Sequence, residues 1–101
     1  MRKIAIAGAG GFSKEVYLTI EAINKISPQW EFLGFFDDNV PKRKFFLDYE
    51  VLGTMNELNN INEDIYVVIA TGKSMNILSI LQKLTSDKLQ FPNIIHPSVI
   101  F

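Results

Sequence analysis

A glycine-rich stretch near the start of the chain carries residues suited to holding a phosphate group. Its residues are Gly8, Gly10, Gly11, Phe12, Ser13 and Lys14. Residues without a Cβ let the backbone turn sharply and approach a ligand closely. The helix expected to begin at Ser13, within the stretch, adds the free N–H groups of its first turn and the positive end of its dipole. The stretch therefore predicts an anion-binding loop, and the natural guest is phosphate.

The spacing of these glycines only partly matches the fingerprint of dinucleotide-binding loops. In the pattern G-x-G-x-x-G the third glycine would stand at position 13, where this chain has Ser13. A tight turn without a ligand is the alternative. The surroundings favour the anion site, because the loop follows a strand-like run and precedes a helix-like one.

Two aspartates could bind the nucleoside part of the same ligand. Asp37 and Asp38 directly follow an aromatic, strand-like run. In nucleotide-binding α/β domains, an acidic residue about 20 residues beyond the glycine loop accepts a hydrogen bond from a ribose hydroxyl. Asp37 lies somewhat further from the glycine loop than this spacing, and a long first helix would account for the additional residues. Ordinary turn chemistry is the alternative for both residues.

A third loop follows the most β-branched run of the chain. It consists of Thr71, Gly72 and Lys73, and it lacks the first glycine and the spacing of a Walker motif. Parallel strands bring their carboxyl ends to one edge of a sheet, and ligands of open α/β sheets bind outside that edge. Three loops at one edge favour a binding site more than any one of them alone.

The first elements that would position these loops form a strand–helix–strand unit. Lys3–Ala7 is a short apolar run typical of a buried parallel strand. A helix is predicted over Ser13–Ile26, and a strand rich in aromatic residues over Trp30–Phe36. The apolar stripe of this helix consists of Val16, Ile20 and Ile23. Such a unit has a right-handed crossover, so the two strands should be parallel.

The rest of the chain predicts more of the same layered arrangement. We expect a loop over Val40–Tyr49, a short strand or extended segment over Tyr49–Gly53, and a helical turn Met55–Leu58 in which Thr54 and Glu57 form a capping box. A fully buried central strand follows over Ile65–Ala70, and a last short strand is expected over Asn93–Ile95. Between these two strands we expect a helix that is capped by Ser74 and has the apolar stripe Ile77, Leu78, Leu81 and Leu84. The predicted fold is α/β, a small Rossmann-like open sheet, mostly parallel, with helices on both faces.

Composition limits the classes of function. With 101 residues, 48% of them hydrophobic, we expect one domain with one core. A net charge of −1 gives no field to attract nucleic acid or an anionic membrane. The basic run Lys42–Lys44 is too short for a nucleic-acid arm and indicates a solvated loop. Cysteine is absent, which excludes disulfides and thiolate chemistry.

The two ends of the chain add expectations about location and completeness. The first apolar run is too short for a signal peptide or a membrane span, so we expect a cytoplasmic protein. His96 is the only histidine and precedes Pro97 without a carboxylate beside it, which favours a structural role over a catalytic or metal-binding one. The apolar end Val99–Phe101 is unusual for a free terminus and indicates the start of a missing segment.

Several of these stretches together resemble one family. The chain is similar to the N-terminal domain of bacterial sugar O- and N-acyltransferases of the left-handed β-helix type, which include sialic-acid O-acetyltransferases and N-acetyltransferases acting on nucleotide-linked amino sugars. The matching segments are Ile6–Val16, Leu33–Asp38, Val51–Gly53, Val68–Gly72 and Ile95–Ser98.

The resemblance implies a division of labour between two halves of a longer protein. Residues 1–97 would form the α/β domain that holds a UDP-sugar or related nucleotide sugar, and residues 98–101 would begin a missing C-terminal domain. That domain, a hexapeptide-repeat β-helix, would form a homotrimer, bind acetyl-CoA between subunits and supply the histidine base. His96 would not be that base. The chain as it stands would hold no cofactor and would not be catalytic.

Two positions depart from the family pattern. The family usually has histidine at position 12 and glycine at position 13, where this chain has Phe12 and Ser13. Ser13 is small enough to keep helix and strand close, whereas Phe12 removes a polar side chain and so bears on which sugar is bound.

Two other functions stay open at this stage. One is a small NAD(H)-binding module of an oxidoreductase, although the incomplete fingerprint and the lack of a second mononucleotide half oppose it. The other is a non-catalytic assembly domain whose loops are only turns.

Overall fold

A computed structural model describes residues 2–8, 13–38, 45–46, 49–70 and 74–92. The strands are β1 Arg2–Ala7, β2 Trp30–Phe36, β3 Phe45–Phe46, β4 Tyr49–Gly53, β5 Ile65–Ile69 and β6 Leu89–Gln90. The helices are α1 Ser13–Ile26 and α2 Ser74–Lys83, with the 3-10 helix η1 Met55–Asn60 between β4 and β5. The boundaries predicted for α1 and β2 agree with those observed.

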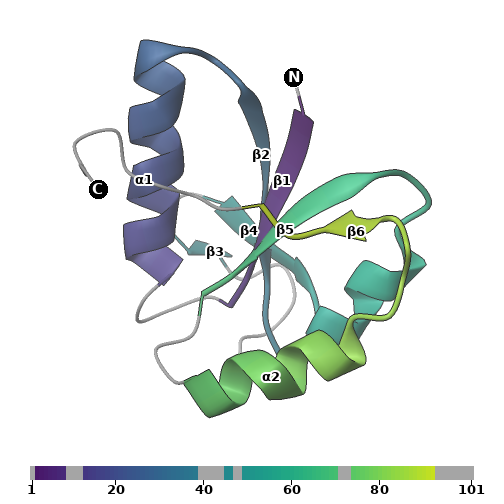
Figure 1. Ribbon diagram of the computed structural model, residues 1–101. Coiled ribbons are helices and arrows are strands. Elements are labelled where there is room, and N and C mark those ends of the chain that lie inside the picture. Colours follow the sequence, from purple (N-terminus) through teal and green to yellow (C-terminus); the bar gives the residue numbers. More distant parts are fainter. Residues whose placement is uncertain (1, 9–12, 39–44, 47–48, 71–73, 93–101) are drawn as a thin grey trace.

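The strands form one open, mostly parallel sheet (Figure 1). Their order is β3-β4-β2-β1-β5-β6. Every neighbouring pair is parallel except β3 and β4, which run antiparallel at one edge. The short strand β3 lies inside the segment Val40–Tyr49, so the prediction of a loop there was wrong for Phe45 and Phe46. The predicted fold class, an open Rossmann-like sheet, is confirmed.

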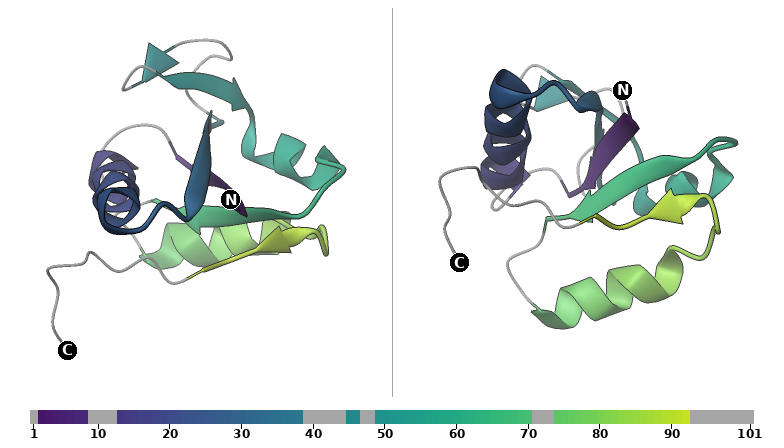
Figure 2. Two further views of the ribbon diagram at one scale, coloured as in Figure 1. Left: turned by 90° about the horizontal axis from the view of Figure 1, so that it is seen from above. Right: turned by 45° about the horizontal axis from the view of Figure 1, so that its top comes forward.

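Helices cover both faces of the sheet, as predicted (Figure 2). The strand β1 alternates between the two layers because successive side chains of a strand point to opposite faces. Ile4 and Ile6 pack in the cluster that α1 covers, whereas Ala5 and Ala7 pack in the cluster under η1 and α2. All four residues are fully buried. Alanine on the second face lets the η1–α2 layer lie close to the sheet.

The strand β5 is less buried than its composition predicted. It lies between β1 and β6 and so is an interior strand, but Tyr66, Val68 and Ile69 are only half-buried. For Val68 and Ile69 the reason is the length of β6, which pairs only with Ile65 and Tyr66. The second half of β5 therefore has β1 as its neighbour on one side and no described strand on the other.

The buried stripe of α2 also differs from the prediction. Leu84 is buried as expected, but the residue that joins it in the core is Ile80, while Leu81 is 38% exposed. Ile80 and Leu84 are four residues apart and so lie on one side of the helix, from which Leu81 is rotated away. The side chains of Ile77 and Leu78, and the predicted strand Asn93–Ile95, lie outside the described residues.

A β-bulge in β2 sets the direction of its last side chains. Ile4 pairs with Phe32 and Ala5 pairs with Gly34, so Leu33 has no partner on β1. Gly34 has a φ of 147°, and a Cβ there would lie 2.9 Å from the carbonyl oxygen of Glu50. Bulges of this kind re-aim the residues that follow them.

Candidate functional site

The carboxyl ends of β1, β2 and β5 meet at one edge of the sheet. The Gly8 amide donates to the carbonyl oxygen of Phe36 at 2.6 Å, and the Ala70 amide donates to that of Ala7 at 3.0 Å. These bonds join the last residues of the three strands. The loops predicted to form the site therefore start from the same place.

Gly8 lies at this meeting point because of its backbone. Its φ is 126°, a region that favours glycine. A Cβ on Gly8 would lie 2.8 Å from the carbonyl oxygen of Ala70. Gly8 is thus explained by the close approach of the β1 and β5 ends, whether or not it also contacts a ligand.

The helix α1 begins at Ser13, within the predicted phosphate-binding stretch. Ser13 is fully buried, and Lys14 is exposed. Gly10, Gly11 and Phe12 lie outside the described residues, as do Thr71, Gly72 and Lys73. The start of α1 lies where the sequence predicted it, and the anion site itself stays a prediction.

The two aspartates at the end of β2 have different surroundings. Asp37 is half-buried, and its amide donates to the carbonyl oxygen of Gly53 at 2.9 Å. Asp38 is exposed, and its Oδ1 accepts a hydrogen bond from the amide of Met55 at 2.9 Å. Met55 is the first residue of η1. Sequence reasoning missed this contact, since nothing in the local pattern links two residues so far apart.

The helix η1 has its own cap at the same point. The amide of Thr54 donates to Glu57 Oε2 at 3.0 Å, which is the Glu57 half of the predicted capping box. The start of η1 is therefore held from within by Glu57 and from the end of β2 by Asp38.

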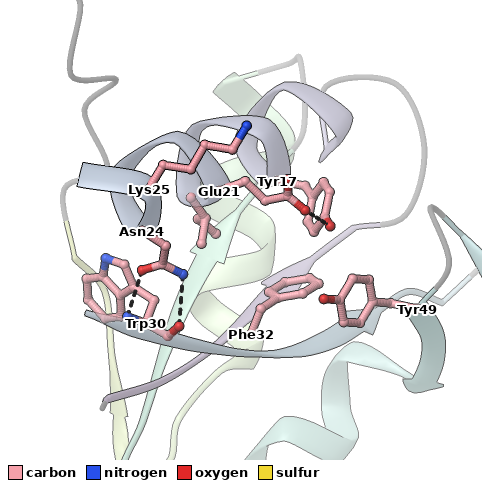
Figure 3. Close-up of a pocket in the computed structure, with 8 residues that line it drawn as sticks. Tyr17, Glu21, Asn24, Lys25, Trp30, Phe32 and Tyr49 are labelled. Atoms are coloured by element: carbon pink, nitrogen blue, oxygen red, sulfur yellow. Dashed lines mark hydrogen bonds between the residues drawn. The ribbon is translucent and has the colours of Figure 1, made fainter. Parts of the chain in front are cut away.

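A hollow of about 350 Å³ lies on the flank of α1, beside β2 and β4 (Figure 3). It is lined by Tyr17, Ile20, Glu21, Asn24, Lys25, Trp30, Phe32 and Tyr49. Since Trp30 is the first residue of β2, the hollow extends toward the edge opposite the carboxyl ends of the strands. It is therefore a different place from the predicted site.

Most polar groups of this hollow have partners inside the fold. Asn24 Nδ2 donates to the carbonyl oxygen of Trp30 at 3.0 Å, and Asn24 Oδ1 accepts from the amides of Gln29 and Trp30, each at 3.0 Å. The Tyr17 hydroxyl donates to Glu21. Burial, followed by the hydrogen bond to Glu21, raises the pKa of Tyr17. These contacts explain the side chains as parts of the turn between α1 and β2 and of the packing beneath α1.

The aromatic side of the hollow is closely packed. The ring centroids of Phe32 and Tyr49 are 4.7 Å apart, and those of Tyr17 and Phe32 are 5.3 Å apart.

In the part of the chain that the structure describes, no group of three or more histidine, cysteine or acidic side chains could hold a metal ion. Within the same residues, no helix is long and apolar enough to cross a membrane.

Comparison with known proteins decides the family. Residues 3–84 match the family defined as the PglD N-terminal domain. The chain belongs to the PglD N-terminal domain family. The matched range contains every predicted site residue from Gly8 to Lys73, and it ends before His96. The resemblance found in the sequence is thus confirmed at the level of the family.

A solved structure shows the same fold within a larger protein. The acetyltransferase domain of PglB from Neisseria gonorrhoeae, in complex with acetyl coenzyme A, matches with a TM-score of 0.75 and 28% sequence identity. The match covers 95% of this chain and 44% of that chain. This chain therefore spans less than half of the length of that relative. No curated protein matches this chain.

Proposed function

We propose that this chain is the nucleotide-sugar-binding domain of a sugar O- or N-acetyltransferase. One observation supports the proposal above the others, which is the 2.6 Å hydrogen bond from the Gly8 amide to the Phe36 carbonyl. It joins Gly8, at which the glycine loop begins, to Phe36, which directly precedes the aspartate pair. Open α/β sheets bind nucleotides at such an edge.

The parts of the nucleotide are assigned by their chemistry. The diphosphate lies against the loop from Gly10 to Lys14, where backbone amides and the α1 dipole favour negative charge. A carboxylate of the Asp37–Asp38 pair accepts a hydrogen bond from a ribose hydroxyl or a uracil N–H. Thr71, Gly72 and Lys73, which follow β5 in the sequence, are the third segment assigned to this site.

The arrangement of the whole enzyme is part of the proposal. A C-terminal hexapeptide-repeat β-helix would bind acetyl-CoA, form the homotrimer and supply the catalytic base, so that residues 1–97 bind the substrate without catalysing its acetylation. The likeness to a longer acetyltransferase chain that was solved with acetyl coenzyme A supports this division. A cytoplasmic location follows, because acetyl-CoA and nucleotide sugars are used there.

The proposal is tested by titrating the chain with UDP, a UDP-sugar and NAD while recording its amide NMR shifts. We expect UDP and the UDP-sugar to move the resonances around Gly8–Lys14 and Asp37. The dissociation constant should lie between micromolar and millimolar, since a few charge-assisted bonds of about 1.5 to 3 kcal/mol each are largely offset by association.

The same titration separates the competing functions. If NAD moved the Gly10 loop and UDP did not, the chain would be an NAD(H)-binding module instead. If no nucleotide moved any resonance, an assembly role would replace the proposal. Gly10→Val serves as the negative variant, because a bulky side chain would block the phosphate and abolish binding.

A further inference from the structure

The helix α1 carries a second row of apolar side chains on the side that faces away from the sheet. Leu18 is 46% exposed and Ile26 is 73% exposed, and Ala22 lies midway between them. Residues four positions apart lie one above the other on a helix, so these three residues form one row. Leu18 is two positions from both Val16 and Ile20, which are buried. Because two positions correspond to about half a turn, the row lies on the outer side of α1.

This outer row does not belong to the core of the described residues. Neither hydrophobic cluster of that part of the chain includes Leu18, Ala22 or Ile26. Figures 1 and 2 show α1 at one side of the molecule, with the sheet along its inner side. The helix therefore has two apolar faces, of which the sheet covers one, and the outer face is suited to packing against another helix.

Two charged side chains flank the outer row. Glu21 and Lys25 lie on the side of α1 that borders the hollow (Figure 3). Both are exposed, and they stand four residues apart in the order that suits an ion pair within a helix. Within the described residues, however, the one ion pair joins Lys3 and Glu63. The charges of Glu21 and Lys25 are therefore available to another molecule.

The order of these residues is complementary to itself when the helix is reversed. A two-fold axis perpendicular to α1 at Ala22 places a second α1 antiparallel to the first, with the same flanks side by side. Leu18 of each copy then faces Ile26 of the other. The midpoint of Glu21 and Lys25 lies one residue from Ala22, a rise of about 1.5 Å, so each glutamate also lies beside the lysine of the other copy. The small side chain of Ala22 lets the helix axes approach to about 8 Å.

We propose that the outer face of α1 is an interface between two copies of this chain. Apolar contacts between Leu18 and Ile26 form its centre, and ion pairs between Glu21 and Lys25 form its flank. The interface requires no nucleotide, so it exists in the ligand-free protein. One helix per copy buries less than the roughly 1,200 Å² of a stable interface, so the dimer is weak, with a dissociation constant of about 0.1 to 1 mM.

Sedimentation velocity and concentration-dependent amide NMR shifts of the ligand-free chain measure this association. Leu18→Ser and Ile26→Ser should each raise the dissociation constant by about tenfold, because every dimer loses two apolar contacts. Leu81→Ser is the control, since it changes an exposed leucine on α2, and its constant should stay within about threefold of that of the unmodified chain.

Charge reversal tests the ion pairs directly. Glu21→Lys puts like charges together at both pairs of the dimer, and so does Lys25→Glu, so each variant alone should associate about tenfold more weakly. A one-to-one mixture of these two variants restores opposite charges at both pairs and should associate about as tightly as the unmodified chain. Asp64→Lys and Lys83→Glu change the net charge by the same amounts at exposed positions outside α1. These two controls should keep the unmodified constant within about threefold, alone and mixed.

Three results would overturn the proposed interface. The first is an unmodified chain that stays monomeric up to about 2 mM. The second is a loss of association in Leu81→Ser as large as that in Leu18→Ser. The third is a mixture of Glu21→Lys and Lys25→Glu that associates no better than either variant alone. Circular dichroism checks that each variant is folded, and the charge reversals decide the question even if a serine variant fails to fold.

Discussion

Gly8 faces the carbonyl oxygen of Ala70 so closely that a Cβ on Gly8 would lie 2.8 Å from it. The neighbouring bond from the Ala70 amide to Ala7, at 3.0 Å, holds the two strand ends together. Any side chain at position 8 would have to push apart the ends of β1 and β5. The start of the glycine loop is therefore fixed by contacts within the sheet.

Gly8→Ala should destabilise the chain by about 2 kcal/mol or more, because it combines an unfavourable φ with a clash against backbone. Urea unfolding followed by circular dichroism measures the loss. Ser27→Ala, at an exposed position just after α1, is the control and should change stability by less than about 0.5 kcal/mol. Equal stability of Gly8→Ala and the unmodified chain would contradict the close approach.

Gly34→Ala should disturb the bulge in β2. The new Cβ would meet the Glu50 carbonyl at 2.9 Å and the Leu52 side chain at 3.1 Å, at a φ that side chains rarely adopt. We expect a loss of about 2 kcal/mol in the free energy of unfolding, measured by urea denaturation.

Gly53→Ala is the matched comparison for Gly34→Ala. Its Cβ would meet mainly the end of the flexible Glu57 side chain, and its φ lies outside the positive range. The side chain can move away at the loss of its hydrogen bond to Thr54, so the expected loss is about 1 kcal/mol. If Gly53→Ala lost more free energy of unfolding than Gly34→Ala, a side chain at position 34 would not strain the bulge.

Lys14→Ala should weaken UDP binding by about threefold, because it removes one exposed positive charge from the first turn of α1. Isothermal titration at low salt is the measurement. Lys83→Ala removes the same charge from the far end of α2 and should leave the affinity unchanged. If both variants lost a similar amount of affinity for UDP, the effect of Lys14 would come from the net charge of the chain and not from a local phosphate site.

Tyr17 should make the folded chain sensitive to alkaline pH. Burial and the bond to Glu21 raise its pKa from the ordinary 10.0, so the folded state keeps the phenol neutral at a pH where the unfolded state loses its proton. The contribution to stability is therefore fully present below about pH 10 and is lost as the pH rises above it.

Urea unfolding at pH 8 and pH 10.5 measures this dependence. The unmodified chain should lose more stability between the two values than Tyr17→Phe, which has no proton to release at this position. Identical pH dependence in the two proteins would contradict the raised pKa of Tyr17.

The sequence by itself determined the elements whose signals are local. The stripe of Val16, Ile20 and Ile23 located α1, and the aromatic run of β2 was recognised with both of its ends, because hydrophobic periodicity and turn residues act over a few positions. The order of these elements predicted a parallel sheet with helices on both faces. The five segments between Ile6 and Ser98 that resemble the family were sufficient, in their order and spacing, to recognise it.

Only the tertiary structure decided how these elements meet. The exposure of Leu81, the half-burial of Val68 and Ile69 in β5 and the bulge at Leu33 depend on which strand or helix lies opposite, and the local sequence pattern carries no such information. The contact between Asp38 and Met55 joins residues far apart in the chain, so it exists only once the sheet has formed. The adjacent aspartates look equivalent in the sequence but differ in the structure, where Asp37 is half-buried and Asp38 is exposed and bonded to Met55, because burial and long-range contacts depend on the elements that lie beside the end of β2.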